Sequence, residues 1–163
     1  MQTPGNSIVA DAGMPARLAA AYVRWELGRR RWIAVWVTGA VVAAFAIFVS
    51  TSLGDAAALG LVALWVALIG GIIGATYGMT RTSVRRAHPA GSSISVEVGD
   101  ASLSYESAMG RGEVRFEALR AAHVTPDAVL IRLRTSPAVA MFPRAVFTDD
   151  ELGRLQRALT PGR

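Results

Sequence analysis

Residues 32–53 read WIAVWVTGAVVAAFAIFVSTSL, and residues 57–79 read AALGLVALWVALIGGIIGATYGM. Neither stretch contains Asp, Glu, Lys, Arg or His. At a helical rise of about 1.5 Å per residue, about 22 residues are long enough to cross a hydrocarbon core of about 30 Å. The two stretches therefore predict a membrane-spanning helical hairpin, in which residues 54–56 form the connecting loop.

Arginines flank this hairpin on one side only. Arg29–Arg31 precede the first stretch, Arg81, Arg85 and Arg86 follow the second, and the connecting loop has no basic residue. Basic residues concentrate on the cytoplasmic side of spanning helices. The sequence therefore predicts a multi-pass protein with both termini in the cytoplasm. Its richness in alanine and its use of arginine without lysine are typical of a GC-rich bacterial coding bias. The predicted location is therefore a bacterial inner (plasma) membrane.

The composition limits what lies outside the membrane. The chain has 163 residues and a formal net charge of +5, and the part not used by the hairpin is enough for one small extramembrane domain. The chain has no cysteine. This excludes disulfides, thiolate nucleophiles and cysteine-based metal sites.

The residues before the hairpin divide into a tail and a helix. Residues 1–13 carry Pro, Gly, Asn and Ser without a sustained period and predict a flexible tail. In residues 14–31, Leu18, Tyr22 and Trp25 recur at helical spacing, which predicts an amphipathic juxtamembrane helix. Such a helix lies either in the headgroup layer or as an extension of the first span that packs on the soluble domain.

Three glycines repeat at four-residue spacing in the second stretch, at Gly70, Gly74 and Gly78. Small residues at this spacing let helix backbones approach closely. The simplest partner is the first stretch of the same chain, which has small residues at Gly39 and Ala43. A second copy or a larger membrane protein is the alternative partner.

Beyond a Pro/Gly/Ser-containing linker at residues 80–92, the period of the pattern changes to two. Ile94, Val96 and Val98 alternate with polar residues, and similar short runs separated by turn residues follow as far as residue 143. Residues 93–163 therefore predict a small β-rich (α+β) cytoplasmic domain, an antiparallel meander of about six strands with one face in solvent.

A C-terminal helix is predicted to cover this sheet. Thr148 and Glu151 have the spacing of a capping box, and Leu152, Leu155 and Leu159 form an apolar stripe. The sequence Thr160-Pro161-Gly162 predicts the end of the helix. An apolar helix stripe can bury the open face of a single sheet.

Three stretches carry a family resemblance: VEVGDASLSYES, GEVRFEALRAAHVTPDAVLIRLR and AVAMFPRAVFTDDELGRLQRAL. Together with the two spans they resemble the bacterial YcxB-like proteins. The resemblance implies a short N-terminal helix, two transmembrane helices and a C-terminal domain like the pleckstrin-homology (PH) fold. Phe116 stands where the pattern of that family tends to carry tryptophan. The resemblance implies an architecture and no activity.

The chain contains few residues that could form a catalytic site. Its histidines are His88, which falls in the linker, and His123, which falls on a predicted strand. The acidic residues Asp149–Glu151 are explained by helix capping. Phosphate-binding loops, HExxH and GxSxG motifs are missing from the sequence. We therefore expect no enzyme, no cofactor, no metal and no small-molecule substrate.

One basic surface is a candidate binding site. Arg115, Arg132 and Arg134 fall on the polar faces of predicted strands, and near an anionic leaflet each such charge contributes about 1 kcal/mol of attraction. The alternative is a solvated sheet face, on which nearby glutamates balance the arginines. Nucleic acid is not an expected partner, because the domain is nearly charge-balanced and lacks exposed aromatic platforms.

These observations predict a non-enzymatic, membrane-anchored interaction module that presents its β domain at the cytoplasmic face. Its expected partner is a membrane protein or a second copy of itself. A domain that binds anionic lipid headgroups through its surface arginines is one alternative. An auxiliary subunit of a transport or self-resistance system is another.

Overall fold

The computed structural model describes residues 6–159, and of Arg31 and Leu53 it describes the backbone alone. Two sequence predictions therefore lie outside the described residues. They are the first part of the flexible tail, residues 1–5, and the helix stop at Thr160-Pro161-Gly162.

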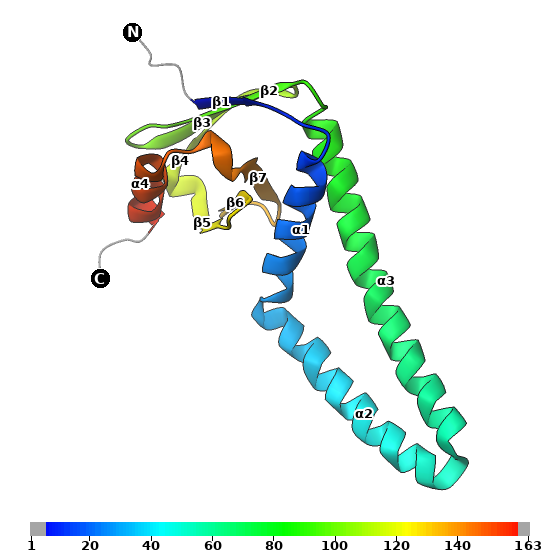
Figure 1. The fold of residues 1–163 in the computed structure, drawn as a ribbon. Coiled ribbons are helices and arrows are strands. Elements are labelled where there is room, and N and C mark those ends of the chain that lie inside the picture. Colours follow the sequence, from blue (N-terminus) through cyan, green and yellow to red (C-terminus); the bar gives the residue numbers. More distant parts are fainter. Residues whose placement is uncertain (1–5, 160–163) are drawn as a thin grey trace. The chain divides into compact units, whose positions relative to one another are not determined.

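The chain divides into two compact units, which are described separately. The hairpin unit is Val23–Met79, and the sheet unit combines Met1–Tyr22 with Thr80–Arg163. The helices are α1 (Met14–Leu27), α2 (Ile33–Leu53), α3 (Asp55–Ala87) and α4 (Asp149–Leu159) (Figure 1). The strands are β1 (Asn6–Val9), β2 (Ser93–Val98), β3 (Ser102–Ser107), β4 (Gly110–Arg115), β5 (Leu119–Val124), β6 (Ala128–Leu133) and β7 (Val139–Pro143).

The hairpin unit contains the two predicted spans. Helix α2 and helix α3 are each long and apolar enough to cross a membrane, and only 6% of each apolar window is buried within the chain. Large apolar side chains such as Phe48 and Leu64 are therefore left uncovered, at 65% and 68% exposure. Gly54, at φ +90°, separates the two helices, and its left-handed backbone favours glycine.

Helix α3 is longer than predicted. It begins at Asp55 inside the predicted loop and continues to Ala87, past the predicted end of the span at Met79. The prediction of a linker over residues 80–92 is therefore wrong for its first part. Residues 80–87 contain no Gly or Pro, so nothing in them breaks a helix that is already formed.

The first sheet joins the two chain segments of the sheet unit. It has four antiparallel strands in the order β1-β2-β3-β4, and Ser7 of β1 pairs with Ser95 of β2. The prediction of a flexible tail is therefore wrong for Asn6–Val9. These residues are held by backbone pairing, which a sequence pattern of four residues does not reveal.

The predicted single meander is in fact two sheets. The second sheet has the order β5-β6-β7, and a 3-10 turn at Phe116–Ala118 separates it from β4. Val114 and Phe116 alternate with polar residues, a pattern that predicts one strand through both, but β4 ends at Arg115 and Phe116 falls in the turn. Strand β6 is the middle strand, and its residues Ala128–Ile131 are buried on both faces. The sheet unit is thus a coarse α+β fold.

Helix α4 closes the core as predicted. Its capping box is present: the Thr148 backbone N–H donates to Glu151 Oε2 at 2.8 Å, and the Glu151 N–H donates to Thr148 Oγ1 at 3.2 Å. Leu152 and Leu155 are buried, and the helix packs on β5 and β2. An ion pair between Arg144 and Asp149 also holds the start of the helix.

The start of α1 belongs to the sheet unit. The Asp11 carboxylate accepts from the Gly13 N–H at 2.7 Å and from Arg17 Nη2 at 2.5 Å. The bond from Arg17 lowers the pKa of Asp11 below its usual value. Leu18 and Ala19 are buried. The apolar face of this part of α1 is therefore covered by protein, which favours the packed helix over one that lies in the headgroup layer.

Candidate functional site

A cavity of about 460 Å³ lies within the sheet unit, between its two sheets and the last turns of α3. Ser83 and Met109 are exposed at its rim. Six lining residues are buried: Val84, His88, Leu103, Leu119, Ile131 and Phe142. Five of these six are apolar. Cavities of this size and character are typical of sites for small apolar molecules.

His88 is the one polar side chain among the buried lining residues. It follows the last residue of α3, and its backbone N–H donates to Val84 O at 2.8 Å. Its side chain is only 8% exposed, and Nδ1 has no hydrogen-bond partner among the described residues. A buried polar group left without a partner costs about 1–3 kcal/mol. This atom therefore has an unused capacity for one hydrogen bond.

Burial also sets the charge of His88. Desolvation lowers the pKa of its imidazole below the ordinary value of 6.5, because burial disfavours the charged form. The side chain is therefore neutral at pH 7. It can then donate one hydrogen bond and accept another.

Protonation of His88 should destabilise the sheet unit. The pKa of His88 is lower in the folded state than in the unfolded state, so the unfolded chain binds more protons as the pH falls below about 6.5. We expect the free energy of unfolding to be highest above pH 6.5 and to decrease as the pH approaches 5.5. Urea unfolding of the full-length protein in nanodiscs, followed by protease sensitivity of the sheet unit, measures this. His88→Gln should flatten the dependence, and an unchanged slope would contradict it.

Aromatic residues form one wall of the cavity. The rings of Tyr105 and Phe142 lie 5.6 Å apart between centroids, and Phe142 meets Phe147 at 6.2 Å. Tyr105 lies over Gly112 on the paired strand, where a Cβ atom would come within 2.5 Å of the ring. Glycine at this position therefore leaves room for the tyrosine ring beside β4.

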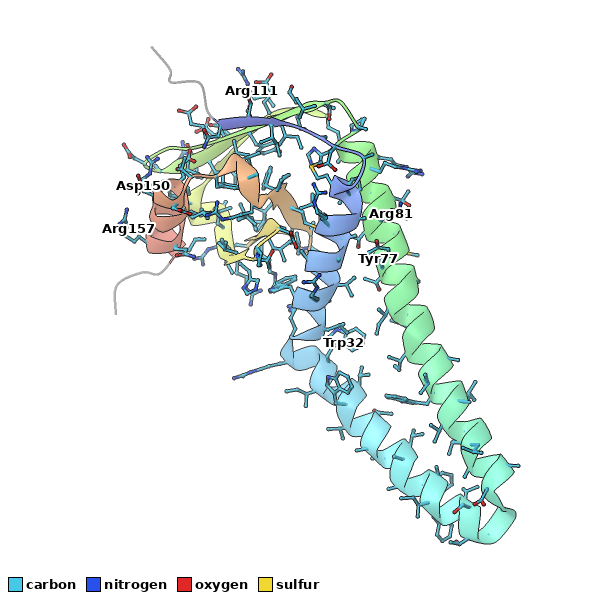
Figure 2. All side chains as sticks on the ribbon, viewed as in Figure 1. Trp32, Tyr77, Arg81, Arg111, Asp150 and Arg157 are labelled. Carbon is cyan, nitrogen blue, oxygen red and sulfur yellow. The ribbon has the colours of Figure 1, made fainter. Side chains whose placement is uncertain are left out.

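An ion pair of the first sheet lies at the edge of this cavity, since Arg111 is one of the lining residues. Arg111 Nη2 bonds Glu106 Oε2 at 2.8 Å across the β3–β4 pair. Glu106 alternates with Tyr105, so the two side chains are on opposite faces. Figure 2 shows Arg111 on the outer side of the sheet. The Arg111 guanidinium is therefore already paired, although the residue lines the cavity.

The three predicted arginines are distributed over both sheets. Arg115 is exposed at the end of β4, opposite Ser102. Arg132 is half-buried on β6, and its Nε has no partner among the described residues. Arg134 follows β6 and donates from Nε to Leu119 O at 3.0 Å. Arg132 and Arg134 are close in sequence at one end of β6, whereas strand pairing does not bring Arg115 to them.

The predicted glycine surface is open within the chain. A Cβ atom at Gly70, Gly74 or Gly78 would meet nothing within 4 Å among the described residues. Gly39 of α2 instead lies against the ring of Trp65, where a Cβ atom would come within 2.8 Å. The simplest prediction, that these three glycines pack on the first span, is therefore wrong. Trp65 contacts α2 from a different position on α3.

The described residues do not suggest a metal centre. No group of three or more His, Cys, Asp or Glu residues within 6–159 could hold a metal ion. The acidic residues Asp149–Glu151 act at the start of α4, as the capping prediction expected. The enzyme and cofactor expectations remain predictions.

Sequence reasoning missed the cavity and the place of His88 in it. The histidine was assigned to a linker between Ala87 and Pro89, and no periodic pattern marks it as buried. The only available signal was the lack of a helix breaker before His88, which would have placed it at the end of the long helix. Comparisons of the chain with protein-family models, curated proteins and solved structures found no match.

Proposed function

We propose that this protein is a non-enzymatic, membrane-anchored interaction module. The hairpin unit anchors it in a bacterial inner membrane, and the sheet unit is presented at the cytoplasmic face. One observation carries the proposal: α2 and residues 57–79 of α3 carry no charged side chain, and only 6% of the apolar window of each helix is buried in the chain. Burial of apolar surface is worth about 25 cal/mol per Å², so helices this exposed require lipid or a protein partner.

The positions of the arginines support the proposed orientation. Arginines flank the outer ends of the two spans, namely Arg29–Arg31 before the first span and Arg81, Arg85 and Arg86 after the second. The turn at Gly54 between the spans lacks basic residues. The positive-inside rule then assigns both chain ends to the cytoplasm. The resemblance to YcxB-like proteins, with their PH-like domain, agrees with this arrangement.

Anchoring is tested by extraction. The full-length protein should stay in the membrane pellet after washing with alkaline carbonate and should be released by mild detergent. Peripheral proteins held by charge are released by such a wash. Release of most of the protein without detergent would contradict an anchor formed by α2 and α3.

The open glycine surface of α3 supports a partner within the membrane. Because no described residue lies beside Gly70, Gly74 and Gly78, another helix can approach the α3 backbone closely there. We propose a second copy of the chain, or a membrane protein, as the partner. A transport or self-resistance system in which the protein is an auxiliary subunit is one setting for such a partner.

The double substitution Gly70→Leu and Gly74→Leu should disrupt this association. Two leucine side chains would separate the backbones, and we expect co-purification of two differently tagged full-length copies in mild detergent to fall about tenfold, which corresponds to about 1.4 kcal/mol. Ile72→Phe is the matched control, since it adds bulk on another side of α3. Association that survives the double substitution would show that this surface is not the contact.

Lipid headgroup binding is the alternative that Arg132 supports, because this half-buried guanidinium lacks a partner for Nε. Full-length protein in anionic nanodiscs should then show salt-sensitive protection of the sheet unit from hydrogen exchange. An Arg132→Ala, Arg134→Ala variant should lose this protection. Protection that is the same in neutral and anionic nanodiscs would leave the interaction module as the function.

A further inference from the structure

We propose that the cavity of the sheet unit is a binding site for a single free fatty acid. This goes beyond the role of membrane anchor, because it assigns a small-molecule ligand to a site between the two sheets. Two independent observations support it. They are the apolar cavity of about 460 Å³ and the unpartnered Nδ1 of His88, which lines it.

The volume of the cavity limits the length of the fatty acid's acyl chain. If each methylene takes up about as much volume as a liquid water molecule, about 30 Å³, the cavity holds on the order of ten to fifteen carbon atoms. This is one acyl chain of medium length. The paired chains of a phospholipid would need at least twice that space.

The lining fixes which part of the ligand goes inside. Leu103, Ile131 and Phe142 are at most 6% exposed and form an apolar floor. A hydrocarbon chain loses no hydrogen bonds when it is placed on such a surface, whereas a sugar or a nucleotide would leave its polar groups without partners. The floor therefore favours an unbranched hydrocarbon tail over polar metabolites.

The polar end of the ligand is assigned to His88. The neutral imidazole can donate to a carboxylate or accept from a protonated carboxyl group. It is the only polar side chain among the six buried lining residues, so it can select a ligand with one polar terminus. Arg111 also lines the cavity, but its guanidinium is already paired with Glu106, so His88 is the polar side chain with an unused hydrogen-bonding atom.

Photocrosslinking tests the proposal on the full-length protein. The protein in lipid nanodiscs is irradiated with dodecanoic acid that carries a diazirine near its methyl end, digested with trypsin and mapped by mass spectrometry. We expect adducts on the peptides of residues 87–111 and 135–144, which carry Leu103 and Phe142. An excess of unlabelled dodecanoic acid should abolish these adducts. Adducts that resist competition, or that are missing from both peptides, would overturn the proposal.

Two variants identify the site. Ala140 lines the cavity and pairs with Ile131 across the strands, so Ala140→Phe should fill the space and reduce labelling of residues 135–144 by about tenfold. Ala138→Phe is the matched control, since Ala138 is exposed just before β7 and outside the lining. Equal labelling of both variants would contradict the site. If the Ala140→Phe variant does not fold, the competition of unlabelled dodecanoic acid with the probe in the unsubstituted protein still decides the result.

His88→Phe tests the polar contact. It preserves bulk but removes the hydrogen-bonding atoms, and labelling by the fatty acid should fall roughly threefold to tenfold, the usual effect of losing one hydrogen bond. A phosphatidylglycerol that carries the same diazirine should label only the spans in every variant. Labelling of residues 135–144 by this phospholipid would show that the cavity accepts a bilayer lipid and would overturn the assignment to a free fatty acid.

The same digest separates this inference from the proposed function. Adducts on the tryptic peptide of residues 32–81 report that α2 and α3 lie in lipid. Adducts there without adducts on residues 87–111 and 135–144 would leave the anchor intact and refute the fatty-acid site. The reverse pattern would support the site and refute the anchor.

Discussion

A cysteine introduced at Asp55 should react with a membrane-impermeant maleimide in intact spheroplasts, whereas one at Ala108 should react only after lysis. The natural chain has no cysteine, so each variant has a single thiol. Asp55 is exposed at the turn between the two spans, and Ala108 is exposed between β3 and β4. The proposed orientation puts these two positions on opposite sides of the membrane, and the difference should be all or none.

The physical reason for this difference is the cost of reversing the hairpin. Six arginines next to the spans would have to move to the outer side, and one arginine at the centre of a spanning helix already costs about 2.5–3.5 kcal/mol on insertion scales. Labelling of both variants in SDS controls for reactivity. A thiol at position 108 that reacts in intact spheroplasts, together with a protected thiol at position 55, would refute the cytoplasmic sheet unit.

Leu155→Ala should destabilise the sheet unit by about 3 kcal/mol, because it leaves a cavity where α4 packs on β5 and β2. Leu155 is 0% exposed. With a urea dependence of about 1.5 kcal/mol/M, the unfolding midpoint should fall by about 2 M. The midpoint is measured by pulse proteolysis of the full-length protein in nanodiscs, in which the fragments from residues 93–159 are followed.

The matched control is Arg157→Ala on the same helix. Arg157 is exposed and projects away from the sheets (Figure 2), and substitutions at such surface positions usually change stability by less than about 0.5 kcal/mol. If the Leu155→Ala variant unfolds at the same urea concentration as this control, α4 does not contribute to the core in the way that its burial indicates.

Much of the fold could be predicted because its signals are local. The spans follow from two uncharged stretches, and the capping box at Thr148 and Glu151 follows from spacing alone. The strand with Ile94, Val96 and Val98 also has the predicted face, since all three are at most 2% exposed. In each case the period of the sequence equals the period of the element.

The rest depends on contacts between distant segments. Strand β1 has only two apolar residues, Ile8 and Val9, and it is a strand because β2 supplies its hydrogen bonds. The two sheets separate at Phe116, where the alternating pattern continues but the backbone turns. The cavity and the burial of His88 arise only when α3, β3 and β7 come together. A local sequence pattern does not show which distant segments will come into contact.

The pairing of β1 with β2 sets an order on biosynthesis. The ribosome makes β1 before either apolar helix and makes β2 only after both. The N-terminal strand must therefore wait, unpaired, until the whole hairpin has left the exit tunnel. The first sheet cannot be completed while α2 and α3 are being translated. With the proposed membrane anchor, its assembly would have to follow the insertion of these two helices into lipid. A delay at that step would leave the β2 edge open to aggregation.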